Sequence, residues 1–351
     1  MGYKMAIIGF GGMGSWHYNC VSKSIPEINI TGIYDIREEA QEKAAGLGLH
    51  IYETPEALYA DKSIDLVLVS TPNDTHAPYA IACLRAGKNV ISEKPVTLSV
   101  TLLDEILAEA KKAGKFFTVH QNRRWDKDFV TVKKILNEKI LSNPYTIESR
   151  VQGSRRALHG WRGYKQNGGG MVLDWGVHLM DQMLNLLPDK VTSVTAHLHN
   201  VFAPEVDDNF TAMFRFESGL TYIINIAMNC FIQQPRWHVS CEDGTALIEN
   251  WELDGKIVKL ADQTEVDWSE EIIYTAAGPT RSMAPRPKET TVELALPAVE
   301  AEWAEYYMNI AEALGGKAEP IVTTAQIRRL MQLIEAVFEA NDKLKEVVCE
   351  I

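Results

Sequence analysis

The feature that most constrains this fold is a glycine-rich turn that directly follows a short apolar segment near the start of the chain. Its residues are Gly9, Phe10, Gly11, Gly12, Met13 and Gly14. Strand, glycine turn and helix in this order are the setting in which G-x-G-x-x-G predicts a dinucleotide-binding turn. Gly9 permits a tight turn, Gly11 lets the backbone approach a pyrophosphate, and Gly14 lets the helix pack on its strand. We expect the turn to bind that pyrophosphate at the helix N-terminus; the alternative is a purely structural turn.

Length, charge and cysteine usage restrict the class of protein. The 351 residues suit two domains, and the net charge of −12 argues against a nucleic acid or an anionic membrane as partner. Five scattered cysteines without C-x-x-C spacing indicate reduced thiols. We find no secretory signal and no apolar run near the roughly 20 residues of a membrane span. We therefore expect a cytoplasmic protein.

Residues 1–122 alternate short apolar runs with helical patterns, which predicts a Rossmann domain with a doubly wound parallel sheet. The predicted strands are Lys4–Gly9, Ile28–Asp35, Ile64–Ser70, Asn89–Ser92 and Phe116–His120. The predicted helices are Gly12–Ser22, Arg37–Leu47, Thr75–Ala86 and Ser99–Ala113.

Residues 123–351 change rhythm and predict a second α/β domain with a large, open, mostly antiparallel sheet, so the fold class is α/β. Its predicted strands are Tyr145–Gln152, Val191–His199, Asn209–Glu217, Thr221–Met228, His238–Glu242 and Thr245–Glu249. Helices are predicted at Asp126–Lys139, Met171–Leu187, Ala298–Leu314 and Thr324–Leu344, with loops over Thr264–Leu296. We expect the last helix to pack back on the first domain.

Polar residues follow the predicted parallel strands at the edge where ligands of such sheets bind. Asp35 ends the second strand and can bind the ribose hydroxyls of NAD. The nearby Arg37 can bind the 2′-phosphate of NADP, but we favour NAD because Asp35 holds the end of the strand. The further cofactor contacts that we predict are Ile36, Ser70, Thr71, Pro72, Asn73, His76, Glu93, Lys94 and Asn122. For Asn73 and His76 the alternative is a plain turn with an exposed imidazole.

Lys94 directly follows a buried strand and is our first candidate for a catalytic side chain. Its ammonium can stabilise the negative charge that develops on an oxygen during hydride transfer. Glu93 can orient Lys94 or bind the nicotinamide ribose, and Pro95 can fix the strand exit, also through a cis peptide bond. The alternative is a surface lysine that precedes a turn.

A second glycine cluster, Gly168–Gly170, opens a helical pattern that carries Asp174 and His178. The two residues are four positions apart and share a helix face. A histidine is the usual proton acceptor for an alcohol, and a carboxylate one turn away can orient it. The alternatives are a solvated helix face or a metal site that includes Asp181, but we expect no metal.

The polar and aromatic loops near these motifs can bind a hydroxylated ring. With Lys94, Asp174 and His178, the substrate-binding residues that we predict are Gln121, Arg123, Arg156, Trp161 and Tyr164. For any one of the loop residues, an incidental place in a solvent loop is the alternative.

Together these motifs make the chain resemble the Gfo/Idh/MocA oxidoreductase family over essentially its whole length. The resemblance rests on GFGGMG, on Glu93-Lys94-Pro95, and on GGGMVLDWGVHLMD over residues 168–181. It implies a Rossmann domain, an open sheet that serves in oligomerisation, and catalytic roles for Lys94, Asp174 and His178. Departures at Gln121–Trp125 and at Ala340-Asn341 leave the substrate and the assembly open.

From residues and resemblance together we expect an NAD-dependent dehydrogenase or reductase that acts on a secondary hydroxyl or keto carbon of a sugar, inositol or glycoside. His178 is the expected general base and Lys94 the stabilising donor. The alternatives are a glycosidase that retains NAD and acts by transient ring oxidation, and a non-catalytic sensor of NAD and sugar. The expected assembly is a homodimer or homotetramer formed through the second sheet.

Overall fold

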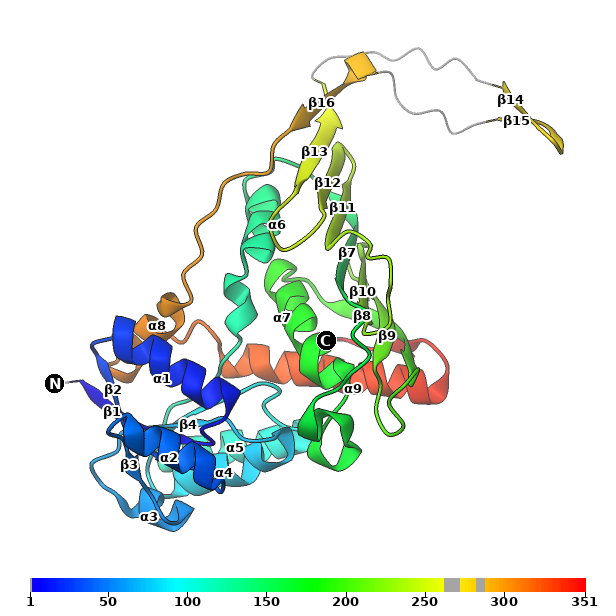
Figure 1. Ribbon diagram of the computed structural model, residues 1–351. Helices are drawn as coiled ribbons and strands as arrows, with labels where there is room; N and C mark the ends of the chain where they lie inside the picture. The colour runs from blue at the N-terminus through cyan, green and yellow to red at the C-terminus, as the bar shows by residue number, and fades with distance from the viewer. Residues whose placement is uncertain (1, 262–271, 282–287) are drawn as a thin grey trace.

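The chain forms two large sheets, shown in Figure 1, a computed structural model that describes residues 2–261, 272–281 and 288–351. The first sheet has six parallel strands in the order β3-β2-β1-β4-β5-β6. Their bounds are Tyr3–Ile8 (β1), Ile28–Tyr34 (β2), His50–Ile51 (β3), Leu66–Val69 (β4), Asn89–Ser92 (β5) and Phe117–Val119 (β6). Because β1 lies between β2 and β4, the strand order reverses at the point where doubly wound sheets bind ligands.

Helices cover both faces of this sheet, which explains why its central strands are almost wholly apolar. They are α1 (Gly12–Ser24), α2 (Glu38–Gly46), α3 (Pro55–Ala60), α4 (His76–Arg85) and α5 (Val100–Ala113). Capping defines the ends of α5: Ser99 Oγ accepts from Leu102 N at 3.2 Å, and Gly114 adopts the left-handed conformation. The predicted Rossmann fold is confirmed.

The second sheet has nine strands in the order β16-β13-β12-β11-β7-β10-β9-β8-β17. Among the described strands of this second sheet, only the β7–β10 pair is parallel, so the predicted open and mostly antiparallel sheet is also confirmed. The strands are β7 (Pro144–Gln152), β8 (Val191–His199), β9 (Asn209–Phe216), β10 (Thr221–Ala227), β11 (Trp237–Cys241), β12 (Gly244–Ile248), β13 (Gly255–Leu260), β16 (Thr291–Leu294) and β17 (Val347–Val348).

The helices α6 (Lys127–Asn137) and α7 (Val177–Leu186) lie on the inner face of this sheet (Figure 1). Alternation in β9 sends Phe210, Phe214 and Phe216 into this core and leaves Met213 outside.

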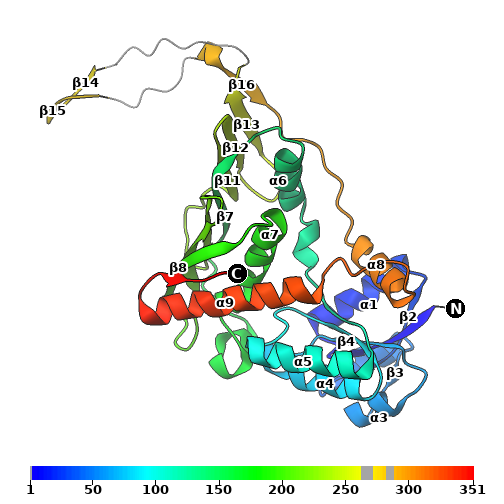
Figure 2. The same cartoon turned by 180° about the vertical axis from the view of Figure 1, so that it is seen from behind.

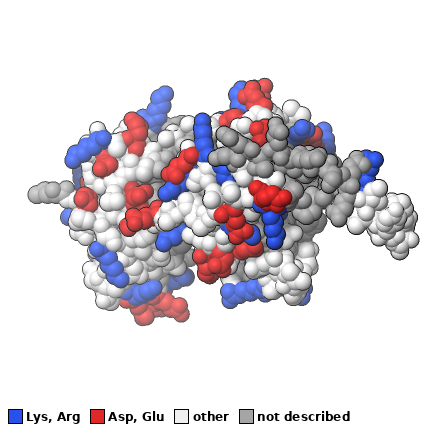
Figure 3. Space-filling model, turned by 90° about the horizontal axis from the view of Figure 1, so that it is seen from above, with Lys and Arg blue, Asp and Glu red and all other residues white. Residues whose placement is uncertain are grey.

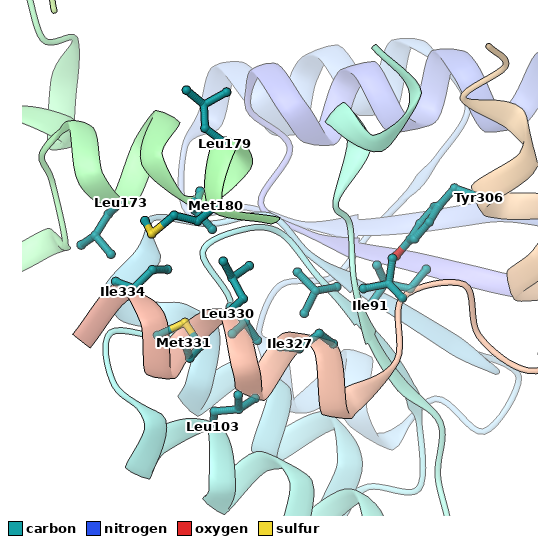
Figure 4. Close-up of a cluster of buried hydrophobic side chains, with 14 of the residues drawn as sticks. Ile91, Leu103, Leu173, Leu179, Met180, Tyr306, Ile327, Leu330, Met331 and Ile334 are labelled. Carbon is teal, nitrogen blue, oxygen red and sulfur yellow. The ribbon is translucent and has the colours of Figure 1, made fainter. Parts of the chain in front are cut away.

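Two helices near the C-terminus return to the first sheet, as Figure 2 shows from behind. The helix α8 (Ala304–Leu314) packs on α1, and α9 (Thr324–Lys343) contacts α5, β6, α7 and β8. In Figure 4, Leu330 and Met331 of α9 lie among Leu103, Met180 and Ile91, so one apolar cluster joins both sheets. This contact across domains was expected for the last helix.

Several elements differ from the sequence expectation. The loops predicted over Thr264–Leu296 contain β16 and a separate two-stranded sheet of β14 (Ile272–Thr275) and β15 (Gly278–Arg281), while 264–271 and 282–287 lie outside the described residues. Pairing with distant strands stabilises such short segments, and local pattern does not reveal it. The strands β3, β13 and β17 and the helix α3 were not predicted, and α8 begins at Ala304 rather than at residue 298.

Candidate active site

A pocket of about 660 Å³ lies along the carboxyl ends of β1, β2, β4 and β5. Its size suits a small-molecule or cofactor site. Most of the residues predicted to bind the cofactor line it: Gly9, Gly11, Gly12, Met13, Asp35, Ile36, Arg37, Ser70, Thr71, Pro72, Asn73, Glu93 and Lys94. Trp161, predicted on the substrate side, also lines it.

The glycine turn has the geometry that a pyrophosphate cradle requires. Gly9 has φ of +90°, and a Cβ at Gly14 would lie 2.2 Å from the Gly9 carbonyl oxygen. A Cβ at Gly12 would meet nothing within 4 Å, so the backbone of this turn faces open space at the start of α1. Free N–H groups at a helix N-terminus attract phosphate oxygens, and these residues therefore fit a dinucleotide.

Asp35 lies at the position of a ribose-binding residue, but its carboxylate already accepts hydrogen bonds from within the protein. It accepts from Phe10 N at 2.7 Å, from Arg37 N at 2.9 Å, and from the Arg37 guanidinium at 2.8 and 3.0 Å. Burial alone would raise the pKa of Asp35, but these donors keep it below its usual value. The guanidinium of Arg37 is 58% exposed, so it can turn away when a ribose takes its place on the carboxylate.

The catalytic candidates Lys94 and Asp174 meet at one end of this pocket, although they come from different domains. Lys94 Nζ donates to the main-chain oxygen of Asp174 at 2.8 Å and to its Oδ1 at 3.1 Å. Arg162 Nε lies 3.2 Å from the same Oδ1. Burial would raise the pKa of Asp174, but Lys94 and Arg162 hold it below the usual value. The carboxylate is therefore ionised and fixed between two cations.

His178 completes the predicted trio from the first turn of α7. It is 5% exposed, and its Nδ1 is buried without a hydrogen-bond partner among the described residues. Burial, together with the nearby charges of Lys94 and Arg123, moves the pKa of His178 well below its ordinary value. The imidazole is therefore neutral near pH 7, and the neutral form is the one that can accept a proton.

The helix that carries these residues does not begin as predicted. Val172–Gly176 forms a π-helical turn before α7, whereas the spacing predicted a regular helix over Met171–Leu187. The carboxylate of Asp207 accepts from Val172 N at 2.8 Å, and its main-chain oxygen accepts from Met171 N at 2.9 Å. Both contacts come from a distant segment, and a π turn within a helix is frequent at functional sites.

The second glycine cluster lets a loop cross the pocket. A Cβ at Gly169 would lie 2.2 Å from Arg162 O, and one at Gly170 would lie 2.3 Å from Asp207 Oδ1. Asn73 Nδ2 donates to Gly168 O at 2.8 Å and ties this loop to the first domain. Trp161, Arg162 and Asn167 of the loop line the pocket. Asn167 was not predicted, and neither was the contact of Arg162 with Asp174, because the path of the loop is not visible in the sequence.

Glu93 belongs to a buried hydrogen-bond network that was not predicted. Its Oε1 accepts from His17 Nε2 at 2.7 Å and from His120 Nδ1 at 2.9 Å, and its Oε2 accepts from Lys94 N at 3.1 Å. Tyr307 OH donates to His17 Nδ1 at 2.6 Å. Burial lowers the pKa of His17 to about 4, so this histidine is neutral. The network places Glu93 against the main chain of Lys94.

Several predicted residues do not line the pocket, and Asp174 and His178 are among them: Asp174 contacts Lys94 and Arg162, which do line it. Phe10 is a core side chain, Gly14 packs α1 on its strand, and His76 has both ring nitrogens at 2.8 and 2.9 Å from the carbonyl oxygens of Pro95 and Thr71. His76 therefore contacts the turn that contains the cis Lys94–Pro95 peptide bond instead of facing a cofactor. Asn122 lies in the short helix Asn122–Trp125, outside the lining.

The predicted substrate residues are dispersed. Gln121 is buried, Arg156 is exposed with φ of +55°, and Tyr164 is 51% exposed. The Arg123 guanidinium lies 4.0 Å from the ring centre of Trp175, whose ring is 5.8 Å from that of His178. Of these four residues, Arg123 is therefore the one that reaches the predicted catalytic residues, through the ring of Trp175 beside His178.

The alternative of a metal at Asp174, His178 and Asp181 is not supported by the geometry. Asp181 forms a buried bidentate pair with Arg124, at 2.6 and 2.7 Å. The described part of the chain brings a different group of metal-ligating types together, His17, Glu93 and His120. Direct hydrogen bonds already join these three side chains, so we assign no ion to them.

A dinucleotide cradle that ends at a lysine–carboxylate pair, with a neutral imidazole close by, defines an NAD(P)-dependent oxidoreductase. Comparison with known proteins gives the family. Residues 3–121 match the family model described as "Oxidoreductase family, NAD-binding Rossmann fold", and residues 129–247 match the GFO/IDH/MocA C-terminal domain. The chain belongs to the GFO/IDH/MocA oxidoreductase family.

Individual relatives agree with this assignment. The chain is 28% identical to the uncharacterized oxidoreductase YdgJ of Escherichia coli, with 96% of each chain covered. It is 27% identical to the scyllo-inositol 2-dehydrogenase (NADP(+)) IolW of Bacillus subtilis, with 99% of this chain and 96% of the relative covered. A solved structure of an NAD-binding protein from Listeria innocua has a TM-score of 0.94 and 42% identity, with 99% of both chains covered.

Proposed function

We propose that this oxidoreductase transfers hydride between nicotinamide and a secondary hydroxyl or keto carbon of a sugar, inositol or glycoside. The observation that carries the proposal is the contact of Lys94 Nζ with Asp174 at the end of the dinucleotide pocket, close to His178. Inositol dehydrogenases among the relatives support a polyol substrate. On the face seen in Figure 3, acidic and basic side chains are interspersed with uncharged ones.

Each side chain has a distinct task in oxidation. When bound, the nicotinamide supplies the hydride acceptor. The neutral imidazole of His178 removes the hydroxyl proton, since a secondary alcohol must lose this proton as the hydride leaves. The Lys94 ammonium donates to the same oxygen and stabilises its developing negative charge, and Asp174 holds that ammonium in place. In reduction, His178 returns the proton.

The pocket also bears on the choice of cofactor. Asp35 is at the ribose position, and its ionised carboxylate would repel a 2′-phosphate. Arg37 can offset this repulsion, because its guanidinium is exposed and within reach. We therefore infer a preference for NAD over NADP, with a smaller margin than an unpaired Asp35 would give.

The test is turnover by the purified protein with NAD and a panel of inositols, sugars and glycosides, followed at the absorbance of reduced nicotinamide. We expect activity on at least one polyol. Lys94→Ala and His178→Ala should each retain cofactor binding but lose about 10²- to 10⁴-fold in kcat. Unchanged kcat in both variants, or no turnover of any member, would contradict the proposal.

A glycosidase that retains NAD is the second candidate. The loop that carries Arg162 crosses the pocket and is tied to the first domain through Asn73, an arrangement that favours slow cofactor release. Glycoside cleavage without added cofactor, by protein that copurifies with NAD, would select this candidate. A sensor without activity is less favoured, because Lys94, Asp174 and His178 are all present and clustered.

We also infer that the protein acts in the cytoplasm as a homodimer or homotetramer formed through the outer face of the second sheet. No helix in the described part of the chain is long and apolar enough to cross a membrane. On that outer face, Met213 is 38% exposed and lies opposite Ile223 of β10. Exposed apolar side chains at the centre of a sheet favour burial against a second copy.

A further inference from the structure

We propose that Arg162 is a positioning residue for the reaction: its guanidinium holds the carboxylate of Asp174 in register with Lys94. This inference rests on the proposed function of the Lys94–Asp174–His178 site and extends it to a contact with Asp174 that was not predicted.

The backbone around Arg162 is fixed from two sides. Gly170 N donates to Arg162 O at 3.0 Å, so the turn closes directly onto the start of the catalytic helical segment. On the other side, Asn167 Nδ2 donates to Asp74 Oδ1 at 3.3 Å, and Asn73 Nδ2 donates to Gly168 O at 2.8 Å. The loop is therefore anchored to both domains, and the glycine positions make this path possible.

The side chain of Arg162 reaches from the pocket wall to the catalytic carboxylate. Its Cζ lies 4.5 Å from the ring centre of Trp161, which restricts the guanidinium, and its Nε lies 3.2 Å from Asp174 Oδ1. Lys94 Nζ binds the same oxygen at 3.1 Å. Exposure of the side chains is 36% for Arg162 and 16% for Asp174, so the arginine links the more open cofactor pocket to the more buried acid.

The shared oxygen gives Arg162 a chemical consequence. Asp174 is largely buried, and burial favours its neutral form, whereas Lys94 and Arg162 both favour the charged carboxylate. Without the guanidinium of Arg162, the Asp174 carboxylate keeps only Lys94 as a cationic partner and as a restraint on its position. The ammonium of Lys94 is then held by a partner that can move, and misplacement of a catalytic donor by about 1 Å can cost about 10²-fold in rate.

The experiment compares Arg162→Gln and Arg162→Lys with the wild type, and uses Arg155→Gln, an exposed arginine of the same segment, as matched control. For Arg162→Gln we expect kcat to fall about 10- to 100-fold, and the acid limb of the pH profile to move to higher pH. Arg162→Lys should recover part of kcat, since it restores the charge. Arg155→Gln should behave as the wild type. Thermal unfolding of every variant tests whether it is folded.

A second readout does not depend on turnover. In protein labelled with ¹³C at aspartate carboxyl groups, the Asp174 signal, assigned with Asp174→Asn, should titrate at higher pH in Arg162→Gln than in the wild type. An unchanged titration overturns the proposal, as does a variant that weakens NADH binding but keeps kcat. If the wild type turns over no polyol, the proposed function fails, whereas this titration still decides the role of Arg162.

Discussion

At the scale of single residues, the buried Asp207 fixes the backbone at the start of the π-helical turn that carries Asp174. It accepts hydrogen bonds from Met171 N and Val172 N, and only 7% of its surface is exposed. Burial raises the pKa of Asp207 to about 6, with the neighbouring Asp208 adding to the rise and the N–H of Val172 opposing it. This residue is therefore a titratable element of stability close to neutral pH.

Replacement of Asp207 by Asn gives a prediction with a definite sign. An acid whose pKa is raised in the folded state contributes stability at low pH that is lost as the pH rises through about 6. The free energy of unfolding of Asp207→Asn, relative to the wild type, should therefore increase by about 1 kcal/mol from pH 5 to pH 7. Urea unfolding at both pH values measures it, and the exposed Asp342→Asn is the control. A constant difference would contradict the assignment.

Residue type and spacing were sufficient to single out Lys94, Asp174 and His178. Their roles stay predictions, but the structure brings the first two into contact and buries the third beside them. The contacts of Arg162, Tyr307 and His17 could not be predicted in the same way. Each residue acts through a partner that is 12 or more positions away, and such pairing depends on the path of the chain, not on local pattern.

At the scale of elements, the glycine turn and the helix that follows it form one unit. The close approach of Gly14 to the Gly9 carbonyl packs α1 on the end of β1. Ser70, which directly follows β4, donates from its Oγ to Gly9 O at 2.6 Å. Strand, turn and helix were predictable because they obey short-range rules of periodicity and turn chemistry. The π turn before α7 was not, since it depends on Asp207, which lies 35 positions from Val172.

A pair of alanine substitutions tests this unit. Gly14→Ala places a Cβ 2.2 Å from a carbonyl oxygen and should destabilise the protein by about 1–3 kcal/mol while weakening NADH binding. Gly46→Ala, in the exposed helix α2 with nothing within 4 Å, should be neutral or stabilise by about 0.5–1 kcal/mol. Urea midpoints and NADH fluorescence titrations measure both effects. Equal midpoints for the two variants would show that the close packing at Gly14 is unimportant.

At the scale of the whole molecule, the two sheets have different relations to their surroundings. Helices cover both faces of the first sheet, whereas α6 and α7 cover only the inner face of the second (Figures 1 and 2). The outer face carries Met213 and Ile223 among polar neighbours such as Thr211 and Asn225. This asymmetry is the structural basis for the oligomer that we propose.

Charge placed on the outer face should prevent the assembly. We expect the wild type to have two or four times the mass of one chain by size-exclusion chromatography with light scattering, and Met213→Glu to shift it toward the monomer. Met308→Glu, at a methionine that is 45% exposed on α8 outside the sheet, should keep the wild-type mass. A monomeric wild type, or an oligomer that tolerates Met213→Glu, would exclude this interface.

The return of α8 and α9 to the first sheet has a consequence for biosynthesis. Thr118 Oγ1 of β6 donates to Val322 O at 2.8 Å, and Tyr307 OH donates to His17 Nδ1 of α1 at 2.6 Å. While a ribosome is still translating the second sheet, the first sheet of the nascent polypeptide lacks α8 and α9, which cover α1, α5 and β6 in the finished protein. We therefore expect its maturation to finish only after translation has passed α9, and to draw on chaperones until then.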